Sequence, residues 1–416
     1  MKLPTREGNM LQQQAIPKAG RRMNAQDPIV DLLDSESDLD VEDTRSDSAP
    51  VKPWDPKKIR ITTKSFTLRE VVDQIKEEEI DLAPDFQRDF VWKQRQRTRL
   101  VESVLLGIPL PAFYFNQDRD GTYQVVDGVQ RLTTIRLFMA GDHTLDSADL
   151  EYLRELDGRK YSDLEPALQR RIRATQIVVH VIEPQTPDEI KYDIFGRVNT
   201  LGEPLSAQEI RHAMSKGRSR QFLYDLVHME SFDKATGNYF YRASSEPDSP
   251  PVRDSKRMTD RELALRFCAF RGFTVEEYRR SENLDAYLVE FTRRIDGRST
   301  SAPELTEPEI ATLRYAFDHA MRNAAAILGR EAFRRFNPDT QRRGPINRAV
   351  FEVQAIALSD FTLGQLEPRM EQVREALLGA FRDPKYVQSV TVGTGDSSQV
   401  ELRISKTRSL LREALT

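Results

Sequence analysis

The sequence predicts an α+β protein in which a first domain of mixed strands and helices is followed by a mainly helical domain. Short β-branched runs alternate with helical patterns between residues 59 and 215, whereas strand signals nearly vanish after about residue 220. The 416 residues leave room for two domains of ordinary size. We therefore predict one domain at 53–220 and a helical domain at 221–416.

The N-terminal segment has a different composition. Between Asp27 and Asp47 there are nine acidic residues and one basic residue, Arg45. Such a stretch buries too little apolar surface to order itself, so we expect residues 1–52 to form a disordered acidic tail. A solubilising role is the simpler interpretation, and mimicry of DNA over a basic groove is the alternative.

Hydrophobic spacing and turn residues define the elements of the first domain. Leu100, Val101, Val104 and Leu105 form one apolar helix face, which Gly107 ends. Strands are expected at 59–63, 111–115, 123–126 and 177–182. Helices are expected at 67–77, 95–106, 130–140, 150–173 with an interruption near Gly158, 187–197 and 206–215.

In the second domain, apolar residues recur at helical spacing. The expected helices lie at 221–231, 259–272, 283–295, 307–328, 346–359, 368–381 and about 400–415. Residues 237–257 are rich in Ser, Pro and Asp and are typical of a long loop. Residues 390–398 are interpreted as a flexible linker, because they lack the lysine of a phosphate-binding P-loop.

The most informative local pattern is a strand-to-helix turn. Asp127 and Gly128 follow the strand at 123–126 and precede a helix, which directs backbone N–H groups and a helix N-terminus at an anion. Gln130 and Arg131 add donors in the first turn, and Asp127 can hold a metal, a ribose hydroxyl or a water. An ordinary turn with a surface arginine is the alternative, since Asp-Gly turns are common.

Two further segments accompany this turn. One is Phe86-Gln87-Arg88, and the other runs from Phe195 through Asn199 to Glu209 and Arg211, with Ser206 and Glu209 spaced as a capping box. Across roughly residues 60–215, the three segments together resemble the N-terminal ParB/sulfiredoxin-like domain of GmrSD-type DNA restriction and phage-defence proteins. The chain departs from this family at Val129, where the family usually has Gln.

The resemblance implies a small mixed sheet with helices that binds or hydrolyses nucleoside triphosphates, or senses modified DNA, and controls a nuclease. Our preferred hypothesis is a nucleotide-binding, NTP-hydrolysing DNA-defence component that uses Mg²⁺ with its nucleotide. Arg131 and Arg88 would neutralise phosphoryl oxygens, and Asp127 would orient water or hold Mg²⁺. The expected phosphate- and nucleotide-binding residues are Gly128, Val129, Gln130, Gln87, Asn199, Glu209 and Arg211. For Arg211, the alternative is a structural pair with Glu209.

Basic residues are also candidates for DNA contacts. Arg95, Arg97 and Arg99 lie around the start of the helix at 95–106, and the family resemblance places them beside the nucleotide turn. Lys216, Arg218 and Arg220 form another cluster, for which pairing with nearby carboxylates is an equal alternative.

Two other functions stay open. A non-catalytic module would read modified DNA in the same pocket, and a stand-alone metal-dependent DNA nickase would hold its metal with Asp127 and Glu209. A scaffold is the plainest alternative. The five histidines do not form the pattern of an HNH nuclease, and His180 lies in a predicted strand. We therefore expect the HNH module to be missing and a nuclease or other defence-system protein to act as a partner.

Composition points to the cytoplasm. The single cysteine, Cys268, excludes an internal disulfide and is expected to be a buried helix residue. No apolar run approaches the ~20 residues that span a bilayer, and the N-terminus lacks the apolar core of a signal peptide. DNA is the expected partner, and membranes are not. Homo-oligomerisation is left open, since the helical half offers a docking surface.

Overall fold

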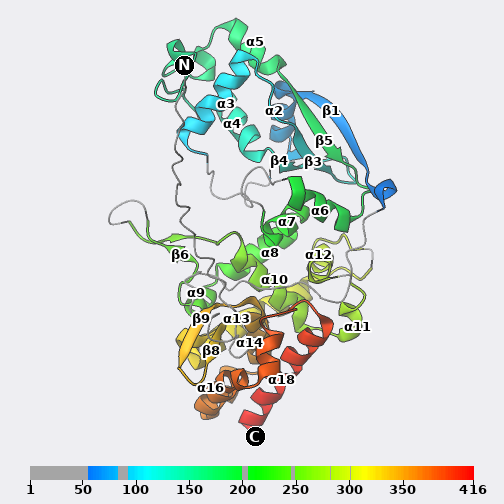
Figure 1. The fold of residues 1–416 in the computed structure, drawn as a ribbon, viewed down its shortest axis with the longest axis vertical. Helices are drawn as coiled ribbons and strands as arrows, with labels where there is room; N and C mark the ends of the chain where they lie inside the picture. Colours follow the sequence, from blue (N-terminus) through cyan, green and yellow to red (C-terminus); the bar gives the residue numbers. More distant parts are fainter. Residues whose placement is uncertain (1–54, 83–91, 199–204, 245–248, 282, 300) are drawn as a thin grey trace, which may run out of the picture. The chain divides into compact units, whose positions relative to one another are not determined.

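The computed structural model describes residues 55–82, 92–198, 205–244, 249–281, 283–299 and 301–416 (Figure 1). The predicted acidic tail therefore lies outside the described residues. The predicted α+β class is confirmed, because a small mixed sheet with helices is followed by a mainly helical region. In the described ranges, no helix is both long and apolar enough to cross a membrane.

The first domain is built on a mixed five-stranded sheet. Its strands are β1 (Ile61–Thr67), β2 (Ile80–Asp81), β3 (Phe113–Gln117), β4 (Tyr123–Asp127) and β5 (Gln176–Ile182), in the order β1-β5-β3-β4-β2. β1 pairs antiparallel with β5, and β3 with β4, whereas β3 runs parallel to β5 and β2 parallel to β4. A turn at Asp118–Gly121 joins β3 to β4.

Helices cover both faces of this sheet. They are α2 (Leu68–Lys76), α3 (Gln94–Leu106), α4 (Val129–Ala140), α5 (Pro166–Ala174), α6 (Asp188–Val198) and α7 (Ala207–Met214). Neighbouring residues of a strand point to opposite faces. Val125 therefore packs in the larger core with α2, α3 and α4, which lie beside one face in Figure 1. Val126 packs on the other face with Phe195 of α6 and Ile210 of α7.

The helix expected at 150–173 is largely wrong. Only α5 is helical there, after the single 3₁₀ turns η2 (Arg154–Leu156) and η3 (Tyr161–Asp163). The buried carboxylate of Glu102, on α3, accepts the backbone N–H groups of Glu151, Tyr152 and Leu153 at 2.7 to 3.0 Å. Because one carboxylate takes three consecutive donors, those N–H groups do not bond within a helix.

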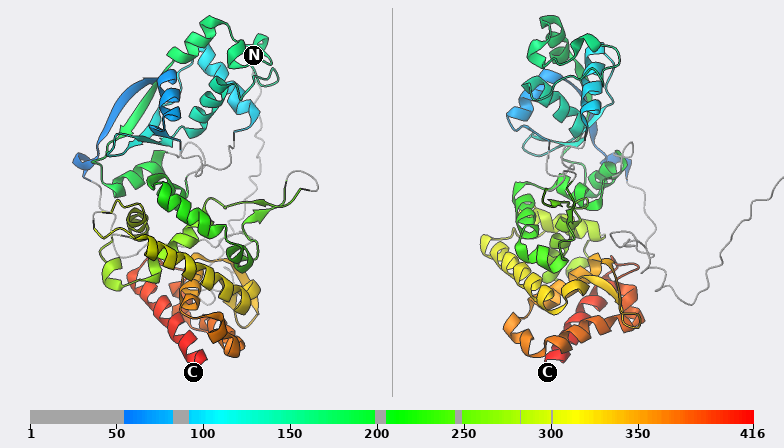
Figure 2. Two further views of the ribbon diagram at one scale, coloured as in Figure 1. Left: turned by 180° about the vertical axis from the view of Figure 1, so that it is seen from behind. Right: turned by 90° about the vertical axis from the view of Figure 1, so that its left-hand side faces the viewer.

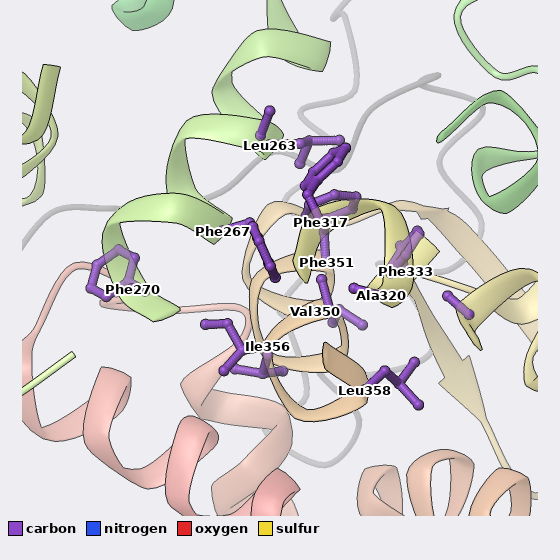
Figure 3. Packing of buried hydrophobic residues seen from close by; sticks show 14 of the residues in the cluster. Leu263, Phe267, Phe270, Phe317, Ala320, Phe333, Val350, Phe351, Ile356 and Leu358 are labelled. Carbon is purple, nitrogen blue, oxygen red and sulfur yellow. The ribbon is translucent and has the colours of Figure 1, made fainter. Parts of the chain in front are cut away.

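The second domain is mainly helical, as predicted. Its helices are α8 (Gly217–Val227), α9 (Glu230–Thr236), α10 (Thr259–Arg271), α11 (Val275–Tyr278), α12 (Leu284–Ile295), α13 (Glu307–Ile327), α14 (Arg348–Ser359), α15 (Leu363–Leu366), α16 (Met370–Gly379), α17 (Pro384–Ser389) and α18 (Ser397–Leu415). α10, α13 and α14 meet through Phe267, Phe317 and Phe351, where the first two ring centroids lie 5.3 Å apart (Figure 3). Cys268 is buried on α10, as expected.

Two short hairpins interrupt the helical domain. One pairs β6 (Tyr241–Arg242) with β7 (Val252–Arg253) inside the expected long loop, and the other pairs β8 (Arg334–Asn337) with β9 (Arg342–Ile346). Helical spacing did not predict either hairpin. The second follows Phe333, whose φ of +65° lies in the left-handed region and turns the chain out of the preceding helical path.

A buried carboxylate joins three helices of the structure. Glu262, on α10, lies with its Oε1 3.0 Å from Arg266 Nη2 and 3.5 Å from Arg211 Nη2, and its Oε2 3.2 Å from Arg348 Nε. Arg211 belongs to α7 and Arg348 to α14. Since a buried charge is costly unless it is paired, this arrangement connects the first domain to the helical core.

A second buried pair holds the last helix. Arg403 of α18 lies with Nη2 3.0 Å from Glu352 Oε1 on α14, and its Nη1 donates to the carbonyl oxygens of Ser389 and Thr394. α14 and α18 pack together, in agreement with the views of Figures 1 and 2. The segment expected as a flexible linker at 390–398 is therefore bound to α18, which begins at Ser397 rather than near residue 400.

The Glu262 pairing predicts acid sensitivity. Burial alone raises the pKa of Glu262, but the guanidinium groups of Arg348, Arg266 and Arg211 outweigh it and lower that pKa to about 2. The folded-state pKa is thus below the unfolded value of about 4.3, so this stabilisation is present above that value and is lost as pH falls toward 2. We expect Glu262→Gln to lower the free energy of unfolding at pH 7 by about 3 kcal/mol and to flatten its decline between pH 5 and pH 3.

Urea unfolding at several pH values measures both effects. Glu155→Gln is the control, because Glu155 is exposed. An identical pH dependence for wild type and Glu262→Gln would contradict the assigned pairing.

Candidate functional site

The turn between β4 and α4 requires glycine for two reasons. Gly128 has φ +101°, in the region that side chains rarely adopt. A Cβ atom at this position would lie 2.2 Å from Cδ1 of Phe113, which is far inside van der Waals contact. The Phe113 ring on β3 thus lies directly behind the Gly128 backbone.

Gly128 is also the N-cap residue of α4. It supplies no side-chain acceptor, and the first turn of α4 holds no acidic residue. The first N–H groups of a helix lack intrahelical acceptors, and the N-terminus carries partial positive charge. The side chain of Val129 is buried, so the group that Val129 can offer to a ligand at the turn is its backbone N–H. This helix start has the features of an anion-binding position.

Arg131 is held beside Asp127 in this turn. Its Nη2 lies 2.7 Å from Asp127 Oδ2 and 3.3 Å from the carbonyl oxygen of Ala112, and its Nη1 donates to the carbonyl oxygen of Pro111. The guanidinium lies 4.1 Å from the centroid of the Phe113 ring. The pair is part-buried, with the side chain of Asp127 31% exposed and that of Arg131 12% exposed.

Desolvation dominates the electrostatics of this pair. Burial raises the pKa of Asp127 above its ordinary value, although the charge of Arg131 and the N–H of Gly128 act in the opposite direction. Burial likewise lowers the pKa of Arg131, against the pull of Asp127. A negatively charged ligand at the turn would therefore compete with Asp127 for a guanidinium that is poorly solvated.

The structure brings the described motif segments to one end of β4. Val126, which precedes Asp127, shares a small apolar cluster with Phe195 of α6 and Ile210 of α7. α6 also packs against both β4 and α7. Three of the predicted site residues, Gln87, Arg88 and Asn199, lie outside the described residues.

Glu209 has partners within the protein. Its Oε2 accepts the backbone N–H of Ser206 at 2.6 Å, and the Ser206 hydroxyl accepts the N–H of Glu209, which forms the predicted capping box. The same Oε2 lies 2.8 Å from Arg257 Nη2. The role of Glu209 in binding a ligand or a metal stays a prediction.

Arg211 is almost fully buried, with 1% of its surface exposed. Its Nε donates to Gln208 Oε1 at 2.8 Å, and its guanidinium pairs with Asp285 as well as with Glu262. The structural alternative predicted that Arg211 pairs with Glu209. In the structure its partners are Gln208, Glu262 and Asp285 instead. The sequence did not reveal Glu262 and Asp285 because they lie in the other domain, and the only local signal was Gln208, three residues before Arg211 on α7.

The three arginines predicted to contact DNA differ in their surroundings. Arg95 is exposed, whereas Nε of Arg97 donates to the carbonyl oxygen of Trp92 at 2.8 Å. Arg99 Nη2 lies 3.9 Å from Glu151 Oε2, with both side chains about half exposed. Their helix, α3, packs on α4. DNA binding by this group stays a prediction.

Within the part of the chain that the structure describes, no group of three or more His, Cys, Asp or Glu side chains is arranged to hold a metal. Mg²⁺ bound to a nucleotide needs only one or two protein carboxylates. Asp127 as such a ligand therefore stays a prediction.

Residues 68–215 match the family model described as GmrSD restriction endonuclease, N-terminal domain. This match confirms the resemblance of that segment to a GmrSD-type N-terminal domain, and it covers less than half of the chain. No curated protein matches. A solved structure of a Pnob8-like ParB-N domain is similar at 9% identity over 86% of this chain and 99% of that chain, with a TM-score of 0.19.

The close contact at Gly128 predicts a specific loss of stability. We expect Gly128→Ala to lower the free energy of unfolding by about 3 kcal/mol, because the new Cβ adds a clash with Phe113 to the backbone strain. Gly121→Ala is the matched control, since Gly121 has a similar φ of +92° but a Cβ added there would meet nothing within 4 Å. Denaturant unfolding measures both variants, and equal losses would contradict the assigned contact.

Proposed function

We propose that this chain is a nucleotide-binding and NTP-hydrolysing component of a DNA-restriction defence system, with its nucleotide site at the β4–α4 turn. The observation that carries the proposal is the start of α4, where Gly128 provides a helix N-terminus without a side-chain cap next to Arg131. The match of residues 68–215 to a restriction endonuclease domain supports DNA as the macromolecular partner.

In this proposal, the N–H groups of Gly128, Val129 and Gln130 bind phosphate oxygens, with the side chain of Gln130 orienting the ligand. Arg131 shifts its donors from Asp127 to the phosphate, where it neutralises charge that develops during phosphoryl transfer. Asp127 is then available to orient a water or to hold Mg²⁺, which would neutralise phosphate charge when bound. Arg88, Gln87 and Asn199 are proposed to complete the site.

One observation favours a second function, a module that binds modified DNA without catalysis. The Asp127 carboxylate already accepts a hydrogen bond from Arg131, so its resting role is to orient that guanidinium. A module of this kind would bind DNA in a modification-dependent manner and would release no phosphate from nucleotides.

Phosphate release from ATP, GTP, CTP and UTP with Mg²⁺, with and without DNA, tests the proposal. We expect turnover of at least one nucleotide, and a reduction of about 100-fold or more in both Asp127→Ala and Arg131→Ala, because each removes a group that acts on the reacting phosphate. Arg136→Ala is the control on the same helix.

Nucleotide binding and thermal unfolding of the same variants separate a catalytic effect from a folding defect. Turnover that survives Asp127→Ala would overturn the central role of Asp127. Absence of both nucleotide binding and turnover in wild type would leave the DNA-binding module as the function of this site.

A further inference from the structure

One edge of the five-stranded sheet is long and free. β1 comes first in the order β1-β5-β3-β4-β2, and in the described part of the chain no strand pairs with it on its other side (Figure 1). Residues 61–65 of β1 are exposed, whereas Phe66 is buried. The strand at the opposite edge, β2, has only two residues. Because an edge strand presents unpaired backbone groups, β1 is the part of this sheet where a further strand can be added.

The backbone hydrogen bonds of β1 alternate between its two sides. The carbonyl oxygen of Arg60 accepts the N–H of Glu183, and the N–H of Leu68 donates to the carbonyl oxygen of Thr175, each at 2.9 Å. In the observed antiparallel register, the even-numbered residues of β1 therefore bond toward β5. The odd-numbered residues bond toward the opposite side. The N–H and carbonyl groups that point away from the sheet are thus those of Ile61, Thr63 and Ser65.

β1 lacks the features that usually protect an edge strand. It contains no proline, and its register with β5 runs without a bulge. Its one charged residue, Lys64, donates to the hydroxyl of Tyr123 at 2.9 Å and lies over that ring, so the ammonium rests on the face of the sheet. On the other face, Ile61 and Val178 are 40% and 43% exposed. Nothing in the sequence of β1 therefore opposes an added strand.

A second copy of β1 can satisfy these outward groups. Antiparallel pairing of β1 with itself joins them only when odd-numbered residues face odd-numbered residues. With Thr63 on a two-fold axis, Thr63 faces itself, and Ile61 of each copy faces Ser65 of the other. All three outward residues then pair, and the same surface is used on both copies, as two-fold symmetry requires.

The charge of β1 selects this register. With Thr63 on the axis, Lys64 of each copy faces the uncharged Thr62 of the other. A slip of two residues in one direction would place Lys64 opposite Lys64, and a slip in the other direction would place it opposite Arg60. Like charges directly opposite each other destabilise a strand pair, so the register centred on Thr63 is favoured over both neighbours.

We propose that this chain forms a two-fold homodimer in which β1 pairs antiparallel with β1 of a second copy, with Thr63 on the axis. The two five-stranded sheets then form one continuous sheet. Main-chain groups make the contact, and the two Thr63 side chains lie side by side as a favourable cross-strand pair. The dimer is independent of the nucleotide site proposed at the β4–α4 turn.

Analytical ultracentrifugation of the full chain over a range of concentrations tests the proposal. Thr63→Pro removes an N–H that points away from the fold and places a ring at the axis in both copies, so we expect it to weaken dimerisation by about 100-fold or more. Thr63→Ala is the matched control. It also loses the hydrogen bond between the Thr63 hydroxyl and His180 Nδ1 but keeps the backbone N–H, so its dimer should weaken by less than about tenfold.

Cross-linking of introduced cysteines tests the register without a proline. In the proposed dimer, Thr63→Cys brings two thiols across the axis with Cα atoms about 5.5 Å apart, whereas Ser65→Cys separates them by about 13 Å along the strand. The native Cys268 is buried and does not compete. We therefore expect a disulfide-linked dimer from Thr63→Cys and none from Ser65→Cys.

Three outcomes would disprove the proposal. They are a wild-type chain that stays monomeric at every concentration, a dimer that folded Thr63→Pro leaves intact, and cross-linking of Ser65→Cys as efficient as that of Thr63→Cys. Circular dichroism establishes whether Thr63→Pro is folded. If it is not, the two cysteine variants decide the question.

Discussion

The arrangement of the helical core depends on one buried carboxylate. Glu262 is removed from water, and three guanidinium groups from α7, α10 and α14 make that burial tolerable. Removing one partner leaves uncompensated charge in a region that is otherwise apolar. This pairing also affects the candidate site. α7 carries two predicted motif residues, Glu209 and Arg211, and is held by the helical domain. The same helix packs beside the end of β4.

At the β4–α4 turn the governing constraint is steric. The Phe113 ring occupies the space that a side chain at residue 128 would need, and its face also supports the guanidinium of Arg131. Because Gly128 has no side chain, the backbone can adopt the left-handed turn. For the same reason, the Phe113 ring can lie where it supports the guanidinium of Arg131. The aromatic residue behind the turn thus links the backbone geometry to the placement of the cation.

Local patterns were sufficient to predict the elements around the turn, since the Asp-Gly break and the Ser206–Glu209 capping box depend on residues close in sequence. Prediction failed where the structure depends on contacts between residues that are distant in the sequence. The helix expected at 150–173 does not begin at residue 150, because the Glu102 carboxylate accepts hydrogen bonds from the backbone N–H groups of residues 151–153. The partners of Arg211 lie 51 and 74 residues away, and no single-sequence pattern connects them. The cluster of Lys216, Arg218 and Arg220 divides among separate carboxylates for the same reason.

The pairing of Arg211 with Glu262 and Asp285 also bears on how such a protein can change over generations. Genetic recombination that joined the first domain of this chain to the helical half of a relative would separate a buried cation from its carboxylates. The hybrid would fold well only if the incoming half offered acids at the same places. Substitutions at these positions are therefore expected to covary. The two halves of the chain would then diverge together and could not be exchanged freely between relatives.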